Sequence, residues 1–221
     1  MNTEIRQKIK EAGIIAVFTL DDPADAVPLA KSLLEGGVTA MELAHCSPEG
    51  IEAIAQIVKS VPKILAGIGT ILTTEHVDAA VAAKADFGFA PGTNPRIIAY
   101  AGKKGLPFAP GIATPSDIDQ ALEQGCSLLK YFPAESLGGL KHLKSVASPY
   151  IDRGVEFIPL GGLNIINVES YLIDPLVAAI GAPWLAPREL IKKGDWKSIT
   201  ASARYAMALV RRSRERQKTG D

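Results

Sequence analysis

The chain has 221 residues, of which 47% are hydrophobic and 22% are charged. This composition is typical of a folded protein with one large core and excludes a disordered chain. Its 24 lysines and arginines are matched by 24 aspartates and glutamates, so no overall charge favours a nucleic acid or an anionic membrane surface as a partner.

The two cysteines, Cys46 and Cys126, form no CxxC or metal-type spacing, which indicates a reducing environment. Residues 1–13 are charged and have helical spacing, unlike a signal peptide. No run approaches the roughly 18 apolar residues of a membrane span. We therefore expect a soluble cytoplasmic protein with an N-terminal helix.

Short apolar runs rich in valine, isoleucine and phenylalanine then alternate with segments of helical spacing, several of which end in glycine. The candidate strands are residues 13–20, 39–45, 64–70, 87–92, 107–113, 128–135, 156–163 and 176–186. Strands that recur every 20–25 residues or so with helices between them predict parallel βα units.

Eight such units in a chain of this length predict the α/β class and a single (β/α)8 TIM barrel over residues 1–221. The competing architecture is an open doubly wound sheet, but no GxGxxG follows the first strand and no GxxxxGK[ST] occurs. Residues 195–218 predict a C-terminal helix that buries Ile199, Ala203, Ala206 and Val210 on one face. Its basic end fits a solvated terminus that complements the helix dipole.

One lysine, Lys130, interrupts the apolar run LLKYFPAE at 128–135. Side chains alternate along a strand, so Lys130 and Phe132 share one face. The same alternation groups Glu42, Ala44 and Cys46. If both sets face the centre of a barrel, a lysine and a glutamate share one enclosed space.

Two interpretations of this pair remain open at this point. One is a structural ion pair. The other is a Schiff-base lysine, because an amine removed from water is more often neutral and can then attack a carbonyl, while a nearby carboxyl moves protons.

The segment LKYFPAESLGG carries a specific resemblance, together with GVTAMELA, GIGT, APG, the PG of FAPGIATPS and PLGGL. From about Gly13 to Trp184 the chain resembles the 2-keto-3-deoxy-6-phosphogluconate and 4-hydroxy-2-oxoglutarate aldolases. The resemblance implies a class I aldolase on a (β/α)8 barrel. It further implies a homotrimer, a small-molecule keto acid as substrate, and neither a metal nor another cofactor.

By motif match, Lys130 forms the Schiff base with a 2-oxo acid and Glu42 is the general acid and base. Thr70 holds the keto-acid carboxylate, and Phe132 and Pro91 shape the wall around it.

The resemblance places the phosphate end at the Gly161–Gly162 turn and Gly181. A Gly-Gly turn leading into a helix that starts near Asn164 would independently make an anion site.

The chain departs from the family pattern around the site. The position of a carboxylate-binding arginine holds Cys46, and that of a threonine before it holds Ala44. Losing a hydrogen bond to a charged group weakens binding about ten- to a hundredfold. At the phosphate end, Leu160 and Pro183 replace hydroxyl-bearing residues, and proline also lacks an N–H donor.

These departures leave two alternatives to the aldolase of a phosphorylated substrate. One is a non-catalytic barrel that binds a small acid or a sugar phosphate, and the other is an aldolase for an unphosphorylated substrate. A metal-dependent aldolase is not favoured, because His45, His76 and His142 are scattered. A nucleophilic role for Cys46 is not favoured either, because its neighbour His45 points to the opposite face.

Overall fold

The computed structural model describes residue 1 and residues 3–219 of the chain. The strands are β1 Ile14–Phe18, β2 Ala40–Leu43, β3 Leu65–Ile68, β4 Phe87–Phe89, β5 Phe108–Ala109, β6 Gly111–Ile112, β7 Leu128–Tyr131, β8 Glu156–Pro159 and β9 Ile180–Ala182. Every ladder between them is parallel, which confirms the predicted α/β class.

The ladders form a six-stranded sheet in the order β5-β4-β3-β2-β1-β9 and a three-stranded sheet in the order β6-β7-β8. The prediction of a single ring of eight strands is therefore met only in part. Pro110 divides the segment expected at 107–113 into β5 and β6, because proline has no N–H to donate to a ladder.

The two sheets are linked at both of their junctions. The carbonyl of Pro110 accepts a 2.8 Å hydrogen bond from the backbone N–H of Lys130 on β7. At the other junction, Phe157 of β8 forms an isolated parallel bridge with Val177, which precedes β9.

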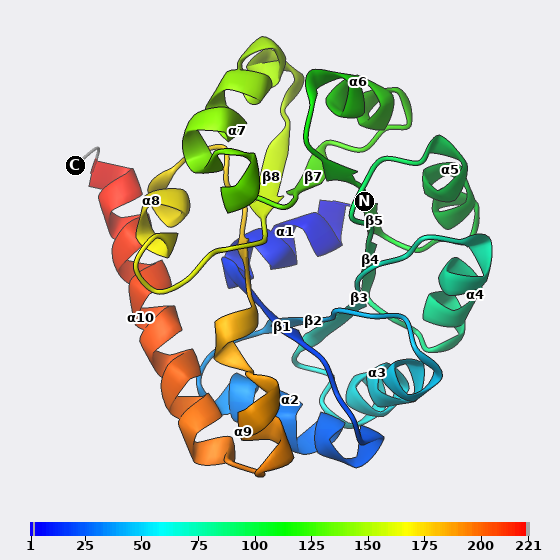
Figure 1. Cartoon of the computed structure of the whole chain (residues 1–221), viewed down its shortest axis with the longest axis vertical. Coiled ribbons are helices and arrows are strands. Elements are labelled where there is room, and N and C mark those ends of the chain that lie inside the picture. Colours follow the sequence, from blue (N-terminus) through cyan, green and yellow to red (C-terminus); the bar gives the residue numbers. More distant parts are fainter. Residues whose placement is uncertain (2, 220–221) are drawn as a thin grey trace.

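The helices surround the strands in Figure 1. They are α1 Thr3–Ala12, α2 Ala26–Glu35, α3 Pro48–Ser60, α4 Thr74–Ala82, α5 Pro95–Lys103, α6 Pro115–Glu123, α7 Gly139–Ala147, α8 Val168–Ile173, α9 Arg188–Lys192 and α10 Trp196–Thr219. Short 3₁₀ helices occupy Pro23–Asp25, Glu135–Leu137, Ser148–Arg153 and Pro183–Leu185.

Several helices begin where the sequence provides a cap. The side chains of Ser47, Thr73, Asn94 and Thr114 accept backbone N–H bonds at the starts of α3, α4, α5 and α6. Such caps satisfy N–H groups that have no partner within the helix, and each is typically worth about 1 kcal/mol. They fix the places where the chain leaves the strand ends and turns back.

The buried side chains form two clusters, one on each face of the sheets. The inner cluster contains Ile5, Ile9, Ala12, Ile15, Ala40, Phe87, Phe89, Ala109, Leu128, Ile158, Ala178 and Ala179. The outer cluster contains alternate strand residues such as Met41, Leu129 and Phe157, which pack against the surrounding helices. We call the side of the sheets that faces the inner cluster the inner face.

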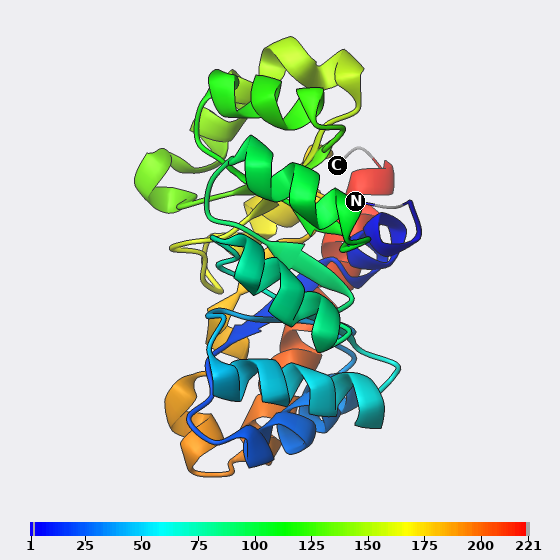
Figure 2. The same cartoon turned by 90° about the vertical axis from the view of Figure 1, so that its right-hand side faces the viewer.

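Helix α1 covers the inner face at the end where the strands begin, as Figures 1 and 2 show. Its Arg6 donates to Glu156 at the start of β8 (2.9 Å) and to the hydroxyl of Ser127, which precedes β7 (2.6 Å). The inner face is thereby closed at the amino ends of the strands.

The C-terminal helix α10 buries the four residues predicted from its spacing, Ile199, Ala203, Ala206 and Val210. It packs closely on α2 at Gly36, where an added β-carbon would lie 2.3 Å from Cβ of Ala203 and 2.9 Å from the carbonyl oxygen of Thr200. Only glycine fits at this crossing without moving the helices.

We expect Gly36→Ala to lower the free energy of unfolding by about 1–3 kcal/mol, because it overpacks this crossing. The control is Gly102→Ala in α5, where an added β-carbon meets nothing within 4 Å. Replacing a helix-interior glycine in open space should stabilise by about 0.5–1 kcal/mol. Urea unfolding measures both, and equal midpoints for the two variants would contradict the packing argument.

Within the part of the chain that the structure describes, no helix combines the length and the apolar character needed to cross a membrane.

Candidate active site

The structure brings Lys130 and Glu42 together on the inner face. Lys130 lies on β7 between two residues of the outer cluster, Leu129 and Tyr131, and Glu42 lies likewise between Met41 and Leu43 on β2. The Nζ of Lys130 donates a 2.9 Å hydrogen bond to Oε1 of Glu42. The alternation of side chains along two separate strands therefore predicted this pair.

The pair is almost completely removed from water, with 6% of the Lys130 side chain and 2% of the Glu42 side chain exposed. The rings of Phe89 and Phe132 lie 5.7 Å and 5.5 Å from the Lys130 nitrogen. Aromatic faces attract a cation and offer no hydrogen bond. Among the described residues, the second carboxylate oxygen of Glu42, Oε2, has no hydrogen-bond partner.

A buried oxygen without a partner is costly, so sites that contain one often bind a ligand or transfer a proton. Glu42 thus uses one oxygen to hold the amine and keeps the other free to accept or donate a proton. This division is what a carboxyl needs to act as an acid and base beside a nucleophilic lysine.

Gly69, which follows β3, makes room for the glutamate. A β-carbon at Gly69 would lie 2.1 Å from Oε1 of Glu42. The glycine of the GIGT motif therefore has a steric role, which the sequence analysis did not assign.

Thr70 lies next to Gly69 in a left-handed backbone conformation with φ of 55°. A threonine pays roughly 1–3 kcal/mol for such a conformation, and residues of this kind concentrate at functional sites. Its hydroxyl donates a 2.6 Å bond to the carbonyl of Ala44. Because that proton is already used, the threonine would contact a carboxylate only through its other groups.

Cys46 is half-buried and packs against the outer cluster. Strand β2 ends at Leu43, so the alternation that grouped Glu42, Ala44 and Cys46 does not extend to the cysteine. Burial raises the pKa of the Cys46 thiol, which keeps it protonated and unreactive. The neighbouring His45 is exposed.

Phe132 lies against the lysine, and Pro91 lies against Gly111 on the neighbouring strand. Gly111 is the register partner of Lys130 on β6, and a β-carbon at Gly111 would lie 2.2 Å from the carbonyl carbon and oxygen of Pro91. Phe132 follows β7 and presents its ring to the amine. Both residues are half-buried at the carboxyl ends of the strands.

The Gly161–Gly162 turn follows β8, with φ values of 106° and 79° that favour glycine. Gly181 lies in β9, and the Leu160 side chain fills the space above it, since a β-carbon at Gly181 would lie 2.3 Å from Cδ1 of Leu160. The turn and Gly181 are thus neighbours.

The helix expected to start near Asn164 begins at Val168 instead and has six residues, so that prediction is wrong. The side chains of Asn164 and Asn167 explain the delay. They accept the backbone N–H bonds of Ile166 and Asn164, both at 2.8 Å, and hold residues 164–167 in turns. Helix α8 therefore does not begin at the Gly-Gly turn.

The structure adds contacts that the sequence did not indicate. The hydroxyl of Tyr131 lies 2.9 Å from Nδ1 of His142 and donates to the carbonyl of Gly139. Burial, with the charge of Glu135, raises the pKa of Tyr131 to about 12. Glu135 in turn accepts a hydrogen bond from the hydroxyl of Tyr171. These bonds hold the segment after β7 against α7 and α8.

Among residues 1, 3–217 and 219, Lys130 is the only buried lysine or arginine. No other buried lysine or arginine among those residues stands in for the arginine that the family pattern places at Cys46. No group of three or more His, Cys, Asp or Glu side chains in that part of the chain is arranged to hold a metal ion.

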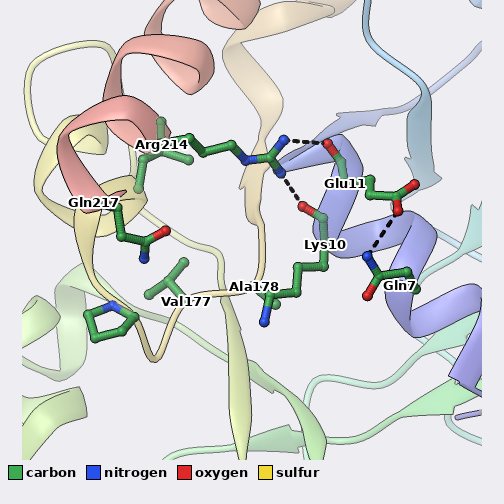
Figure 3. Close-up of a pocket in the computed structure, with 10 residues that line it drawn as sticks. Gln7, Lys10, Glu11, Val177, Ala178, Arg214 and Gln217 are labelled. Atoms are coloured by element: carbon green, nitrogen blue, oxygen red, sulfur yellow. Dashed lines mark hydrogen bonds between the residues drawn. The ribbon is translucent and has the colours of Figure 1, made fainter. Parts of the chain in front are cut away.

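A separate cavity of about 590 Å³ lies at the amino ends of the strands, beside α1 (Figure 3). Its Arg214 donates to the backbone carbonyls of Glu11 and Lys10 at the end of α1, and Lys10 pairs with Glu156. The cations of this cavity are thus engaged in holding α1 and α10 together. It lies at the opposite end of the strands from the segments that surround the lysine.

The structure combines parallel strands with a buried lysine–glutamate pair and with turns at the carboxyl ends of the strands. These features define a class of protein that is built to bind a small carbonyl compound. Comparison with known proteins is more specific. A family model described as KDPG and KHG aldolase matches residues 5–202, so the chain belongs to that aldolase family. The resemblance stated from the sequence motifs is confirmed.

Curated relatives support the assignment. The 2-dehydro-3-deoxy-phosphogluconate aldolase of Treponema pallidum (strain Nichols) is 39% identical over 206 residues, which cover 93% of this chain and 97% of the relative. The KHG/KDPG aldolase of Escherichia coli (strain K12) is 34% identical over 194 residues, which cover 88% of this chain and 90% of the relative.

Solved structures agree. The 2-keto-3-deoxy-6-phosphogluconate aldolase of Zymomonas mobilis ZM4 with 3-phosphoglycerate has a TM-score of 0.86 at 34% identity, covering 93% of this chain and 96% of its own. The KDPG aldolase of Legionella pneumophila, with pyruvate captured as a covalent carbinolamine, has a TM-score of 0.86 at 32% identity, covering 92% of this chain and 98% of its own.

Proposed function

We propose that the protein is a class I aldolase that cleaves a 2-keto-3-deoxy sugar acid or a related 4-hydroxy-2-oxo acid to pyruvate and an aldehyde. The observation that carries the proposal is the buried contact of 2.9 Å between the Lys130 amine and the Glu42 carboxylate. The carbinolamine captured in the Legionella pneumophila aldolase is the addition product that a lysine amine and pyruvate would form here.

The reaction starts when neutral Lys130 attacks the C2 carbonyl of the keto acid. Glu42 supplies a proton as the carbinolamine loses water, which gives a protonated imine at C2. The imine withdraws electrons, so the C3–C4 bond breaks as the Glu42 carboxylate accepts the 4-hydroxyl proton, and the aldehyde leaves. Protonation of the remaining enamine and hydrolysis of the imine release pyruvate and the free lysine.

The remaining site roles are part of the same proposal. The Thr70 segment would bind the carboxylate next to the imine, and Phe132 and Pro91 would form the wall around it. Cys46 would lie at the edge of the carboxylate-binding part of the site as a small neutral side chain. The Gly161–Gly162 turn and Gly181 would receive the far end of the substrate.

We also propose that the two sheets are parts of one eight-stranded (β/α)8 barrel, formed by a single domain over residues 1–221. The interrupted strand at Pro110 and the bridge between Phe157 and Val177 support this, because they link the sheets at both junctions. Residues 2, 220 and 221 of that domain lie outside the described part of the chain.

A cytoplasmic homotrimer is proposed from the family resemblance. Leu72, Ile165 and Ile166 are 52%, 54% and 89% exposed, and association would remove such apolar side chains from water. The two unpaired cysteines fit a reducing compartment. Light scattering should give three times the chain mass of 23.4 kDa.

Glu42→Gln tests the acid–base role. The amide keeps the size of the side chain and a hydrogen bond to Lys130 but cannot transfer protons, so we expect kcat for pyruvate release to fall about 10²–10⁴-fold. A coupled lactate dehydrogenase assay with 2-keto-3-deoxy-6-phosphogluconate and 4-hydroxy-2-oxoglutarate measures it. The control is Glu49→Gln on the exposed start of α3.

An unchanged rate in Glu42→Gln would remove that carboxyl from the mechanism. Binding of these keto acids by the wild-type protein with no pyruvate release from any of them, nor from an unphosphorylated 2-keto-3-deoxy acid, would favour the alternative of a non-catalytic barrel.

A further inference from the structure

The Gly161–Gly162 turn is held against the segment that follows β7. The backbone N–H of Ala134 donates to the carbonyl of Leu160 (2.9 Å), and the backbone N–H of Glu135 donates to the carbonyl of Gly161 (3.0 Å). The turn also packs closely on this segment, since a β-carbon at Gly162 would lie 2.6 Å from Cβ of Glu135. The segment after β7 therefore sets the position of the turn.

The turn offers hydrogen-bond donors to a ligand. Within the described chain, the backbone N–H groups of Gly161 and Gly162 have no protein acceptor. Free N–H groups of successive residues can bind an oxygen atom of a ligand, including an anionic one. Such donors contribute most when they are in place before the substrate arrives. Whatever fixes the turn therefore also fixes the donors that meet the far end of the substrate.

A side-chain hydrogen bond ties the segment after β7 to helix α8, which follows the turn. The hydroxyl of Tyr171 on α8 donates to Oε1 of Glu135. Tyr171 is 1% exposed. Burial, together with the bond to Glu135, raises the pKa of Tyr171, so the hydroxyl keeps the proton that it donates. The turn is thus held on one side by Glu135 and on the other by the helix that carries Tyr171.

The start of α7 meets the same bond. A β-carbon at Gly139 would lie 3.1 Å from Oε1 of Glu135 and 3.2 Å from the hydroxyl of Tyr171. The hydroxyl of Tyr131 on β7 donates to the carbonyl of Gly139 (3.2 Å). The Glu135–Tyr171 bond therefore lies where β7, α7 and α8 come together, and these contacts fix both of its partners in place.

Helix α8 is also attached to the protein on its other side. Its Glu169 pairs with Arg212 (3.0 Å) and with Arg216 (3.2 Å) of α10, and the ring of Tyr171 is buried. Removing only the hydroxyl of Tyr171 should therefore leave α8 packed in the fold. It would release the side of the helix that adjoins the turn.

We infer that Glu135 and Tyr171 are positioning residues for the aldehyde half of the substrate. Their hydrogen bond holds the Gly-Gly turn where its N–H groups can meet the far end of the keto acid. The Lys130–Glu42 pair lies within β7 and β2 and is held separately. This role rests on the proposed aldolase function and deepens it, because the two halves of the site should respond separately to substitution.

The test compares two reactions of the same protein. Exchange of the pyruvate methyl hydrogens with deuterium from heavy water needs only the imine, which loses a proton to give the enamine and then gains a deuteron. Cleavage of the keto acids used in the coupled assay also needs the far end of the site. For Tyr171→Phe we expect kcat/KM for cleavage to fall about ten- to a hundredfold, through a higher KM, with the exchange rate unchanged.

Two further substitutions separate the bond from the charge. Glu135→Gln keeps a carbonyl oxygen that can accept the Tyr171 hydroxyl, so it should retain most of the wild-type kcat/KM. Glu135→Ala should behave like Tyr171→Phe. The matched control is Tyr100→Phe, which also removes a tyrosine–carboxylate bond, the 3.0 Å bond to Asp78 between α5 and α4. It should leave both reactions unchanged.

An unchanged kcat/KM for cleavage in Tyr171→Phe would overturn the inference, as would a Glu135→Gln protein that is as impaired as Glu135→Ala. Equal losses of exchange and cleavage in Tyr171→Phe would also overturn it, because the hydroxyl would then support the whole site. In these cases exchange by the wild-type protein leaves the aldolase proposal standing. If the wild-type protein neither exchanges the methyl hydrogens nor cleaves a keto acid, the aldolase proposal fails and the inference with it.

Discussion

Lys130→Met is expected to lower kcat for pyruvate release by at least about 10⁴-fold, the scale seen when a covalent nucleophile is removed from an enzyme. Methionine keeps most of the length and apolar volume of lysine but cannot form an imine. Steady-state assay of the purified variant, with the fold checked by circular dichroism, measures the loss.

Lys103→Met is the matched control for this variant, because Lys103 is an exposed lysine at the end of α5. It should keep wild-type kcat. A folded Lys130→Met protein with more than about a tenth of the wild-type rate would exclude an essential covalent role for the lysine.

The same substitution should also destabilise the fold, by about 3–5 kcal/mol. Removing the amine leaves the Glu42 carboxylate buried at 2% exposure with no cation beside it, and Oε2 already has no partner among the described residues. Urea unfolding followed by tryptophan fluorescence measures the loss.

A second substitution separates the free-energy cost of the unpaired buried charge from the free energy lost through poorer packing. The double variant Lys130→Met with Glu42→Leu removes both charges, and replacing a buried ion pair by apolar residues is often neutral or stabilising. We expect it to regain most of the lost stability while remaining inactive. A double variant as unstable as the single one would mean that the buried charge is not the source of the loss.

Seven of the eight predicted segments start within one residue of a strand, whereas the segment expected from residue 176 corresponds to β9, which begins at Ile180, and the ends were predicted less well. The predicted segments 39–45 and 128–135 correspond to strands that end at Leu43 and Tyr131. Most of the extra residues are apolar or small, with His45 and Glu135 as the exceptions, so their pattern resembles that of a strand. In the structure these residues form the segments that follow the strands. Most of the candidate site residues lie in such segments.

This difference explains which site residues could be paired from sequence. Lys130 and Glu42 lie within regular strands, where alternation holds, and their meeting was predictable. Cys46 lies beyond the end of β2, where alternation no longer applies, and it packs against the outer cluster instead.

Other features depend on contacts between distant segments. The steric role of Gly69 follows from the position of a carboxylate on the neighbouring strand, and the left-handed conformation of Thr70 has no sequence signal because threonine rarely adopts it. The late start of α8 results from side-chain bonds between Asn164 and Asn167, which compete locally with the helix.

The most direct test of the central claim is to reduce the protein with borohydride in the presence of pyruvate and to locate the added mass by peptide mass spectrometry. The proposal predicts one adduct, on the peptide that contains Lys130, and none in Lys130→Met. Absence of an adduct at saturating pyruvate, or an adduct that persists in Lys130→Met, would contradict it.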